Sequence, residues 1–338
     1  MIALHHPGQR AHDPKFFLSS GAPKPCPEQP MRIDALLEGV ASLGLPVLTP
    51  DDHGLDAIAA IHPQRYLTFL QTIHARWQNI PAASAEVIPN IHPACRTDGY
   101  PLSAVGQAGF HMTDTSCPIS ATTWGAAYAS AQTAIAGAAL ILQGQRAAYA
   151  LCRPPGHHAF AELAGGFCYL NNTAIAAQQL VLSGRKVAIL DVDLHHGNGT
   201  QGIFYDRPDV LTVSIHAHPE RYYPFFWGYP EERGARAGEG ANLNLCLPRG
   251  SADAPFVLEL DRALQAITLW GADTLVLALG LDAYEGDPFA GLAVTTQGFA
   301  RIGQDIAALG LQTLIVQEGG YLCPALGQNL AAVLKAFL

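Results

Sequence analysis

The 338-residue chain carries a formal net charge of −9, and its composition is 49% hydrophobic and 14% charged. This balance supplies a large apolar core and excludes an intrinsically disordered chain. The negative charge argues against a nucleic acid or an anionic membrane as the main partner, and favours neutral or cationic small molecules.

The first part of the chain predicts helices separated by irregular stretches. Residues 1–30 are rich in proline, glycine and histidine and predict a loop-forming entry segment. Helical periodicity then predicts a helix over 31–43 and two helices over 56–77, with a break at Pro63. Residues 78–120 show no period and are interrupted by proline and glycine. Because so long a stretch inside a compact domain is usually functional, we expect a lid, a subunit contact or an ordered surface excursion.

From residue 124 onward, helices and strands alternate. We predict helices over 124–142, 173–182, 254–270, 297–309 and 328–338, and strands over 147–152, 187–190, 209–216, 241–248, 274–280 and 313–320. Strands that alternate with helices form a parallel sheet covered on both faces. The predicted fold is therefore α/β with three α/β/α layers, and the absence of a linker-like composition shift predicts a single domain over 1–338.

The cysteines and the apolar segments indicate the compartment. The 7 cysteines include no C-x-x-C pair, which fits a reducing compartment rather than a disulfide framework or a thiolate zinc site. The N-terminus lacks a basic region followed by an apolar core. Every apolar run of near membrane-spanning length is interrupted by glycine or polar residues. We therefore expect a cytoplasmic protein with no membrane or nucleic-acid partner.

The stretch KVAILDVDLHHGNGT, residues 186–200, predicts a metal site. A buried strand ends here in polar residues, and alternation along the extended chain places Asp191, Asp193 and His195 on one face. Carboxylate and imidazole groups at this spacing suit one divalent metal. The alternative is a solvated polar strand end, which the number of polar groups directly behind the strand makes a poor explanation.

A third metal ligand is expected from another strand end. Asp282 lies just past strand 274–280 and is the best candidate, whereas Asp287 precedes Pro288 and is interpreted as a turn residue. One histidine with two carboxylates suits Zn²⁺ with a position left open for water, and the same ligand types also accept Fe²⁺, Mn²⁺ or Co²⁺.

Two further strand ends carry groups suited to acid–base and oxyanion chemistry. His157 and His158 follow strand 147–152, and Tyr321 follows strand 313–320, which ends in two glycines. Asp191 and Asn198 are the expected hydrogen-bond acceptors for the two rings. A ring that faces a carboxylate is pushed toward its charged form and one that faces an amide is not, so the two histidines need not be equivalent.

The motifs RPPGHHA, GGFCYLNN, DVDLHHGNGTQ, GLDAYEGDP and EGGY occur in this order. Together they resemble the zinc-dependent histone deacetylase family, which has the arginase–deacetylase fold, and most of all its bacterial acetylpolyamine amidohydrolases. The resemblance implies hydrolysis of an N-acetyl amide, with Asp193, His195 and Asp282 as zinc ligands. It also implies that His157 and His158 act on protons, with His158 as the carrier, and that Tyr321 stabilises the oxyanion.

The resemblance also implies residues that bind the substrate and a second ion. The residues that match the narrow tunnel for the acylated amine are Gly166, Phe167, Tyr223 and Phe289. A structural potassium ion is implied beside the zinc, at Asp191, Asp193, His195, Ser214 and Ile215. The insertion over 78–120 implies a homodimer, because in the resembling amidohydrolases a comparable loop meets its twin.

The substrate expectation departs from the polyamine-selective members of the family, which place carboxylates at the tunnel mouth. We expect an apolar mouth formed by Phe16, Phe17, Val105, Phe167, Tyr223 and Phe289, with Asp98 or Asp114 as substitutes for the missing carboxylates. Such a mouth should favour short acetylated diamines over long acetylpolyamines. Alternatives are a protein lysine deacetylase, a non-catalytic acyl-amine binding protein and a two-metal ureohydrolase. The intact catalytic positions argue against the second, and Asn198, in place of a carboxylate, argues against the third.

Overall fold

The computed structural model describes residues 1–93 and 99–338. In this part of the chain a sheet of 8 strands runs in the order β4-β1-β5-β10-β9-β6-β7-β8, and every neighbouring pair is parallel. The strands are β1 (Ile2–Leu4), β4 (Val47–Leu48), β5 (Ala147–Ala150), β6 (Val187–Asp191), β7 (Val210–Ala217), β8 (Asn242–Leu247), β9 (Thr274–Leu279) and β10 (Gln312–Gln317). An antiparallel hairpin joins β2 (Phe16–Ser19) to β3 (Ala22–Pro25).

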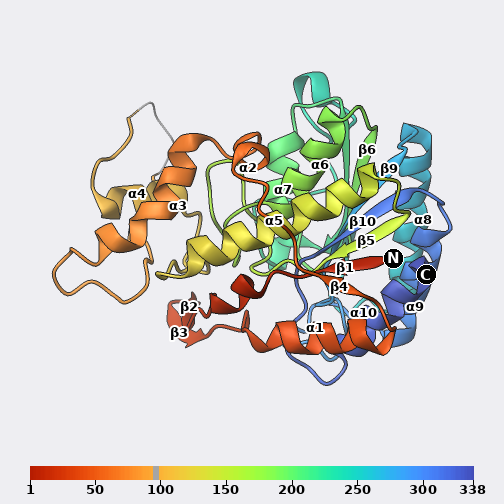
Figure 1. The fold of residues 1–338 in the computed structure, drawn as a ribbon, viewed down its shortest axis with the longest axis horizontal. Helices are drawn as coiled ribbons and strands as arrows, with labels where there is room; N and C mark the ends of the chain where they lie inside the picture. Colours follow the sequence, from red (N-terminus) through yellow and green to blue (C-terminus); the bar gives the residue numbers. More distant parts are fainter. Residues whose placement is uncertain (94–98) are drawn as a thin grey trace.

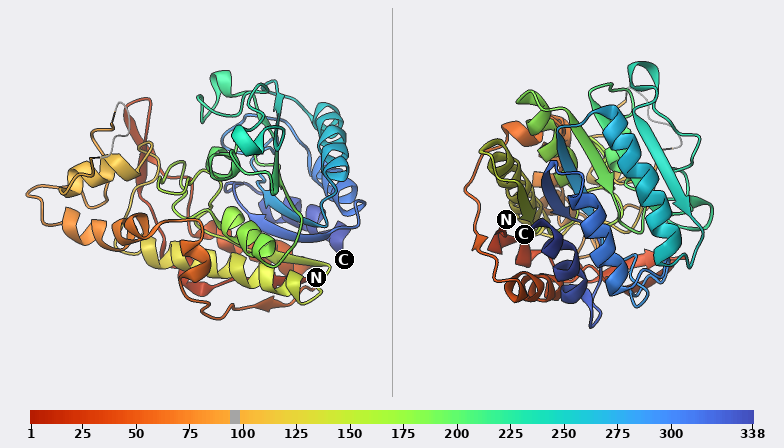
Figure 2. Two further views of the ribbon diagram at one scale, coloured as in Figure 1. Left: turned by 90° about the horizontal axis from the view of Figure 1, so that it is seen from above. Right: turned by 90° about the vertical axis from the view of Figure 1, so that its right-hand side faces the viewer.

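Helices cover both faces of the sheet (Figures 1 and 2). They are α1 (Met31–Ser42), α2 (Asp56–Ala59), α3 (Gln64–Trp77), α4 (Ala104–His111), α5 (Thr123–Leu142), α6 (Asn172–Leu182), α7 (Asn198–Phe204), α8 (Asp253–Trp270), α9 (Thr296–Ala307) and α10 (Leu326–Leu334). Short 3₁₀ helices lie at Pro7–Ala11, Pro219–Arg221, Arg236–Gly238 and Lys335–Phe337.

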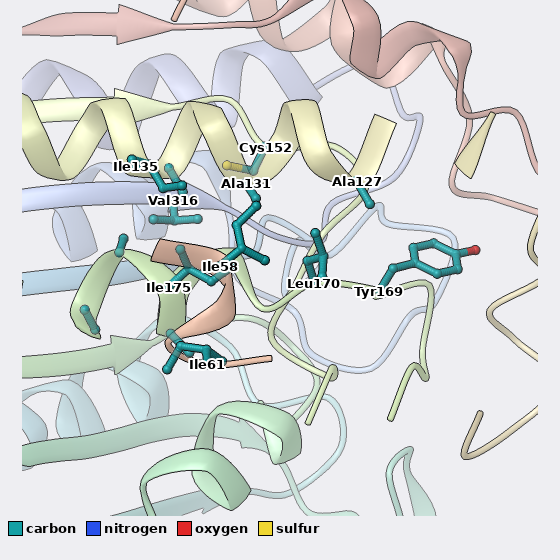
Figure 3. Close-up of a cluster of buried hydrophobic side chains, with 14 of the residues drawn as sticks. Ile58, Ile61, Ala127, Ala131, Ile135, Cys152, Tyr169, Leu170, Ile175 and Val316 are labelled. Carbon is teal, nitrogen blue, oxygen red and sulfur yellow. The ribbon is translucent and has the colours of Figure 1, made fainter. Parts of the chain in front are cut away.

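The strands bury side chains on both faces, as a covered parallel sheet requires. Along β6, Val187 and Ile189 pack into the cluster formed with α5 and α6, part of which Figure 3 shows. Ala188 and Leu190 alternate with them and pack into the cluster formed with α1, α8, α9 and α10. The predicted three-layer α/β/α architecture is therefore confirmed.

Two stretches expected to be irregular contain regular structure. The entry segment 1–30 contributes β1, which pairs with β4 and β5, and the β2–β3 hairpin. A strand of 3 residues is too short to show a period, and its pairing partners stabilise it. The stretch 78–120 contains α4, where a Cβ on Gly109 would lie 2.0 Å from the carbonyl oxygen of Ile91, so glycine permits the close approach. In Figure 1, the hairpin, α3 and α4 lie to one side of the sheet.

Helix α5 is long and apolar enough to cross a membrane by length and composition alone, and it is the one helix of this kind in residues 1–93 and 99–338. In the fold it packs against the sheet and α6, and 72% of its apolar window is buried. It is accounted for as a core helix.

The four strands whose ends were predicted to carry reactive groups lie next to one another in the sheet. Strands β5, β10, β9 and β6 are consecutive neighbours in the sheet, so their carboxyl ends meet at one edge. The four segments that follow these strands are the ones in which the sequence predicts reactive groups. Ligands of open parallel sheets bind beyond such an edge.

A buried histidine links the helical layer to the sheet and predicts acid sensitivity. His62 Nδ1 donates to the carbonyl of Ala161 (2.9 Å), and Nε2 accepts from the backbone N–H of Asn171 (2.9 Å), so the ring must be neutral. Burial lowers the pKa of His62 to about 4. Because the unfolded chain binds this proton near pH 6.5, the contribution of His62 to stability is intact above pH 6.5 and is lost as the pH falls toward 4.

Between pH 7 and pH 5, we expect the unfolding free energy of the wild type to fall by about 2 kcal/mol more than that of the His62→Gln variant. Glutamine retains a donor and an acceptor but does not titrate, so the stability of the variant depends less on pH. Replacement of the buried ring makes the variant less stable than the wild type at pH 7. Urea unfolding at the two pH values measures the difference. Parallel pH dependences for the two proteins would contradict this assignment.

Candidate active site

Three buried side chains converge beyond the ends of β6 and β9. The Nδ1 atom of His195 lies 3.3 Å from Asp193 Oδ1 and 3.0 Å from Asp282 Oδ2. One ligand atom from each of the three residues lies within 4.8 Å of the other two. The structure thus brings together the three ligands predicted from the sequence.

The surrounding backbone orients the two carboxylates of this group. The N–H of Gly319 donates to Asp193 Oδ2 (2.8 Å) and the N–H of Leu194 donates to Asp282 Oδ1 (2.9 Å), which orients both carboxylates. Cβ atoms on Gly280 and Gly319 would lie 2.1 and 2.4 Å from Asp193 Oδ2. The two glycines therefore let the chain close around the carboxylates.

The electrostatics of the three groups favour a positive charge between them. Burial disfavours a charged His195, but the hydrogen bonds with Asp193 and Asp282 outweigh this effect and raise its pKa to about 9. Burial, with the neighbouring Asp193, raises the pKa of Asp282 to about 6. Burial also opposes ionisation of Asp193, but the charges of His157 and His195 lower its pKa. A divalent cation fits this mixed nitrogen and oxygen donor set.

The tandem histidines have different partners and opposite proton affinities. His157 Nδ1 faces Asp191 Oδ2 at 2.9 Å, and His158 Nδ1 faces Asn198 Oδ1 at 2.7 Å. Burial opposes the charge on His157, but Asp191 and Asp193 raise its pKa to about 10. Burial and the adjacent charge of His157 lower the pKa of His158 well below its usual value. One ring is thus charged and the other neutral at physiological pH.

Glu318, which the sequence analysis left without a role, supports the tandem-histidine turn. One oxygen of its buried carboxylate accepts from the N–H groups of Gly156 (2.6 Å) and His157 (3.0 Å). The other oxygen accepts from the Thr173 hydroxyl (2.8 Å). Burial raises the pKa of Glu318 to about 7. The first residue of the EGGY motif therefore fixes the segment that carries both histidines.

A buried ion cluster connects this region to the N-terminal segment. Glu28 pairs with Arg32 (2.7 Å) and Arg153 (2.8 Å). Arg32 also donates to the carbonyls of Glu318 (2.7 Å) and Gly320 (2.6 Å), and its guanidinium lies 5.0 Å from the centre of the Tyr321 ring. Residues far apart in the sequence therefore lock the EGGY turn in place.

Tyr321 lies against the same site, and Asp287 holds its backbone. Burial and the nearby Asp282 raise the pKa of Tyr321 well above 10, so the phenol keeps its proton. Asp287 Oδ2 accepts from the N–H of Tyr321 (2.9 Å) and Oδ1 from the N–H of Phe289 (2.9 Å). Asp287 lies in a turn, as interpreted from the sequence, and its buried carboxylate also links two elements of the site.

The three histidines of the site and Tyr321 line one pocket of about 320 Å³. Its lining residues are Phe17, Leu18, Ser19, Ser20, Ser116, Pro155, His157, His158, Gly166, Phe167, His195, Tyr223, Phe225, Phe289, Gly319 and Tyr321. Phe167 contacts Tyr321 edge to face at 6.0 Å, and Tyr223 contacts His158 edge to face at 4.8 Å between ring centres. All four residues predicted for the tunnel line this pocket.

The predicted mouth is only partly correct. Phe17 lines the pocket, but Phe16 and Val105 do not, and Val105 instead packs against the core cluster around α5. Asp114 does not line the pocket, and Asp98 lies outside the described residues. Leu18, Ser19 and Ser20 of the hairpin and Phe225 were missed, because their place at the pocket depends on contacts between distant segments.

Two of the residues named for a potassium ion, Asp193 and His195, are also among the three predicted metal ligands. Asp191 on β6 is in register with Ser214 on β7, and Ile215 follows it in the same strand. The Asp191 carboxylate already accepts from the N–H of Asp193 (3.0 Å) and faces His157.

Comparisons with known proteins agree with this geometry. The family model described as "Histone deacetylase domain" matches residues 26–337. The acetylpolyamine amidohydrolase of Burkholderia pseudomallei (strain 1710b) is 47% identical over 338 residues, covering 100% of this chain and 98% of that protein. Acetylpolyamine amidohydrolase 1 of Pseudomonas aeruginosa is 43% identical, covering 100% of this chain and 99% of that protein.

Solved structures give the same result. A crystal structure of acetylpolyamine aminohydrolase from Burkholderia pseudomallei superposes with a TM-score of 0.96 at 46% identity, covering 100% of this chain and 98% of that one. The similarity extends over the sheet, its helices and the strand ends that carry the site. The chain belongs to the histone deacetylase family.

Proposed function

We propose that this protein is a metal-dependent amidohydrolase that removes acetyl groups from small acetylated amines. The observation that carries the proposal is the convergence of Asp193, His195 and Asp282 with a neutral and a charged histidine at one aromatic-lined pocket. Family membership supports the same reaction class. Zn²⁺ is the proposed metal, and Fe²⁺, Mn²⁺ and Co²⁺ suit the same donor atoms.

A divalent metal held by Asp193, His195 and Asp282 would act as a Lewis acid on the amide carbonyl and increase the acidity of a water molecule. The chain supplies the remaining groups. The Tyr321 phenol keeps its proton, so it can donate a hydrogen bond to the oxyanion that develops on the former carbonyl oxygen. Tyr321 is buried, and the lower dielectric around a buried group strengthens this bond.

His158 is the residue best suited to transfer the proton. Its Nδ1–H donates to the side-chain oxygen of Asn198, which leaves Nε2 as the acceptor of the neutral ring. Nε2 can accept a proton from the attacking water and return it to the departing amine nitrogen. His157 already carries a proton beside Asp191, so it contributes a fixed positive charge.

The pocket supports slender acetylated amines as substrates. The relatives are named for acetylpolyamines, and in the described residues the pocket lining is aromatic, histidine, serine, glycine, proline and leucine, with no carboxylate. A lining without carboxylates offers little compensation for desolvating several ammonium groups. We propose short acetylated diamines as preferred substrates, with acetyl-lysine side chains as the second candidate because they present the same slender stem.

The test compares kcat/KM for acetylputrescine, acetylspermine and an acetyl-lysine peptide at one ionic strength. Metal-stripped protein restored with Zn²⁺, Fe²⁺, Mn²⁺ or Co²⁺ provides the control for metal dependence. We expect acetylputrescine to be hydrolysed with the highest kcat/KM. A strong preference for acetylspermine would overturn the substrate proposal, and full activity in the stripped protein would overturn the metal proposal.

We also propose a homodimer and a structural potassium ion. The stretch 78–120 exposes 87% of Leu102 and 58% of Ile91, which supports a homodimer formed through this region. A mass of 35.9 kDa by light scattering, that of one chain, would contradict the dimer.

Asp191 and Ser214, adjacent in register, support a structural potassium ion, which activity measurements in K⁺-free and K⁺-containing buffer would test.

A further inference from the structure

Asp114 connects the two walls of the pocket without lining it. Its Oδ2 atom accepts from the hydroxyl of Tyr223 (2.7 Å) and from the backbone N–H of Gly166 (3.1 Å). Its Oδ1 atom accepts from the backbone N–H of Ser116 (2.7 Å). One carboxylate oxygen thus lies between the residue that forms one wall and the residue that precedes Phe167 on the other.

The wall that carries Phe167 has an unusual backbone that needs support. Gly166 and Phe167 have consecutive positive φ angles of 52° and 68°. A positive φ is costly for a bulky side chain such as phenylalanine, and surrounding contacts must maintain it. The hydrogen bond from Gly166 to Asp114 is one such contact, and the paired backbone bonds between Gly165 and Cys168 are others.

The other wall is formed by Tyr223, and a hydrogen bond holds the hydroxyl end of its side chain. Tyr223 reaches Asp114 through its hydroxyl, and its ring contacts His158 edge to face at 4.8 Å. Packing there is tight, since a Cβ on Gly166 would lie 2.9 Å from the Tyr223 hydroxyl oxygen and 2.4 Å from His158 Cδ2. Anchoring the hydroxyl therefore fixes the ring both against the first wall and against the proton-carrying histidine.

We propose that Asp114 is a positioning residue whose hydrogen bonds to Tyr223 and Gly166 set the width of the pocket, so that unbranched amines enter and branched ones are excluded. The proposal rests on the proposed amidohydrolase function. With the acyl group at the metal ligands and Tyr321, the amine stem must pass between Phe167 and Tyr223. A gap of fixed width admits a methylene chain, whereas a ring or a branch requires one wall to move.

The hydrogen bonds also distinguish this role from direct recognition of a cationic substrate. Both oxygens of Asp114 already accept hydrogen bonds from the protein, and the residue does not line the pocket in the described part of the chain. A carboxylate used in this way positions its donors instead of binding an ammonium group.

The test uses two neutral amides, N-acetylbutylamine and N-acetylcyclohexylamine, with cationic acetylputrescine as a third substrate. In Asp114→Ala and in Tyr223→Phe, we expect the kcat/KM preference for the butyl over the cyclohexyl amide to narrow about tenfold, as for other steric discriminations. The double variant should add little to Asp114→Ala, because that change already removes the hydrogen bond to the Tyr223 hydroxyl. Asp114→Asn retains an acceptor oxygen and should recover part of the preference.

A matched control exists on α5, at a residue pair that is not among those lining the pocket. The Tyr128 hydroxyl donates to the exposed Asp52 carboxylate, so Tyr128→Phe removes the same type of hydrogen bond outside the pocket. This variant should keep the wild-type preference, and all variants should keep their bound metal. Calorimetric binding of the two neutral amides gives a second readout that does not depend on turnover.

The outcomes are separable. Wild-type selectivity in Asp114→Ala and Tyr223→Phe, in both hydrolysis and binding, would overturn the proposal. It would also be overturned if Asp114→Asn weakened only acetylputrescine and Tyr223→Phe had no effect, since Asp114 would then bind the substrate charge. If the variants narrowed the binding preference for the butyl amide but the wild type hydrolysed none of the three substrates, the width-setting role would stand and the proposed function would fail.

Discussion

Asp193→Ala and Asp282→Ala are expected to yield folded protein that retains almost no metal and has no measurable deacetylase activity. Each change removes one of the three proposed ligands, and even the loss of a residue that merely orients a ligand commonly costs about 10- to 100-fold in metal affinity. The fold should persist, because the metal ligands lie beyond the strand ends and outside the apolar clusters that hold the sheet. Metal content per chain, measured by plasma emission spectrometry, is the primary readout.

Asp287→Asn is the matched control for both variants. Asp287 is a buried aspartate in the same segment as Asp282, but its oxygens accept from the backbone of Phe289 and Tyr321 instead of facing His195. The variant should keep its metal and lose part of its turnover through Tyr321. Stoichiometric metal with normal turnover in either alanine variant would show that the ligand assignment is wrong.

The convergence of Asp193, His195 and Asp282 could be predicted from the sequence because its signal is local. Asp191, Asp193 and His195 alternate directly behind the buried residues of β6, and Asp282 follows β9 in the same way. The rule that parallel strands end at one edge then brings the segments together without any knowledge of side-chain contacts. The order β5-β10-β9-β6 shows why the inference succeeded, since the four reactive strand ends are neighbours.

The residues that support the site could not be predicted, because their roles depend on contacts distant in sequence. Arg32 contacts the carbonyl of Gly320 across 288 positions, and Asp114 contacts Tyr223 across 109. No local period or motif marks such a pair. The support that Asp287 gives to Tyr321 was missed for the same reason: its turn is visible in the sequence, but its bond to the backbone of Tyr321, 34 residues away, is not.

Short elements were missed for an energetic reason. Strand β1 has 3 residues and β4 has 2, too few for alternation to be recognised, and both depend on pairing within the sheet. Helix α4 contains Gly106 and Gly109, which weaken helical propensity by about 1 kcal/mol each relative to alanine. The Ser103 side chain caps the helix by accepting from the N–H of Gly106 (3.1 Å). The close approach of Ile91 to Gly109 and the hydrogen bond from Arg76 to Gln107 also offset the low helical propensity.

Tyr321→Phe is expected to lower kcat and kcat/KM together by about 100- to 1000-fold, the usual cost of removing one oxyanion donor. The phenylalanine ring should stay in place, because Asp287 holds the backbone N–H and the ring packs against Phe289 at 4.7 Å and over Arg32. Metal content and thermal stability should therefore remain at wild-type values.

Tyr222→Phe separates the loss of this hydroxyl from a general effect of removing a phenol near the metal ligands. The Tyr222 ring lies 5.3 Å from that of His195, but its hydroxyl donates to the carbonyl of Phe289 (2.6 Å) and it does not line the pocket in the described part of the chain. We expect its kcat to stay within about tenfold of the wild type, because only a support of Phe289 is lost. Steady-state kinetics on acetylputrescine compares the two variants. A loss of equal size in both would point to disturbed packing around His195, whereas near-wild-type turnover in Tyr321→Phe would remove Tyr321 from the mechanism and leave the oxyanion to the metal and His157.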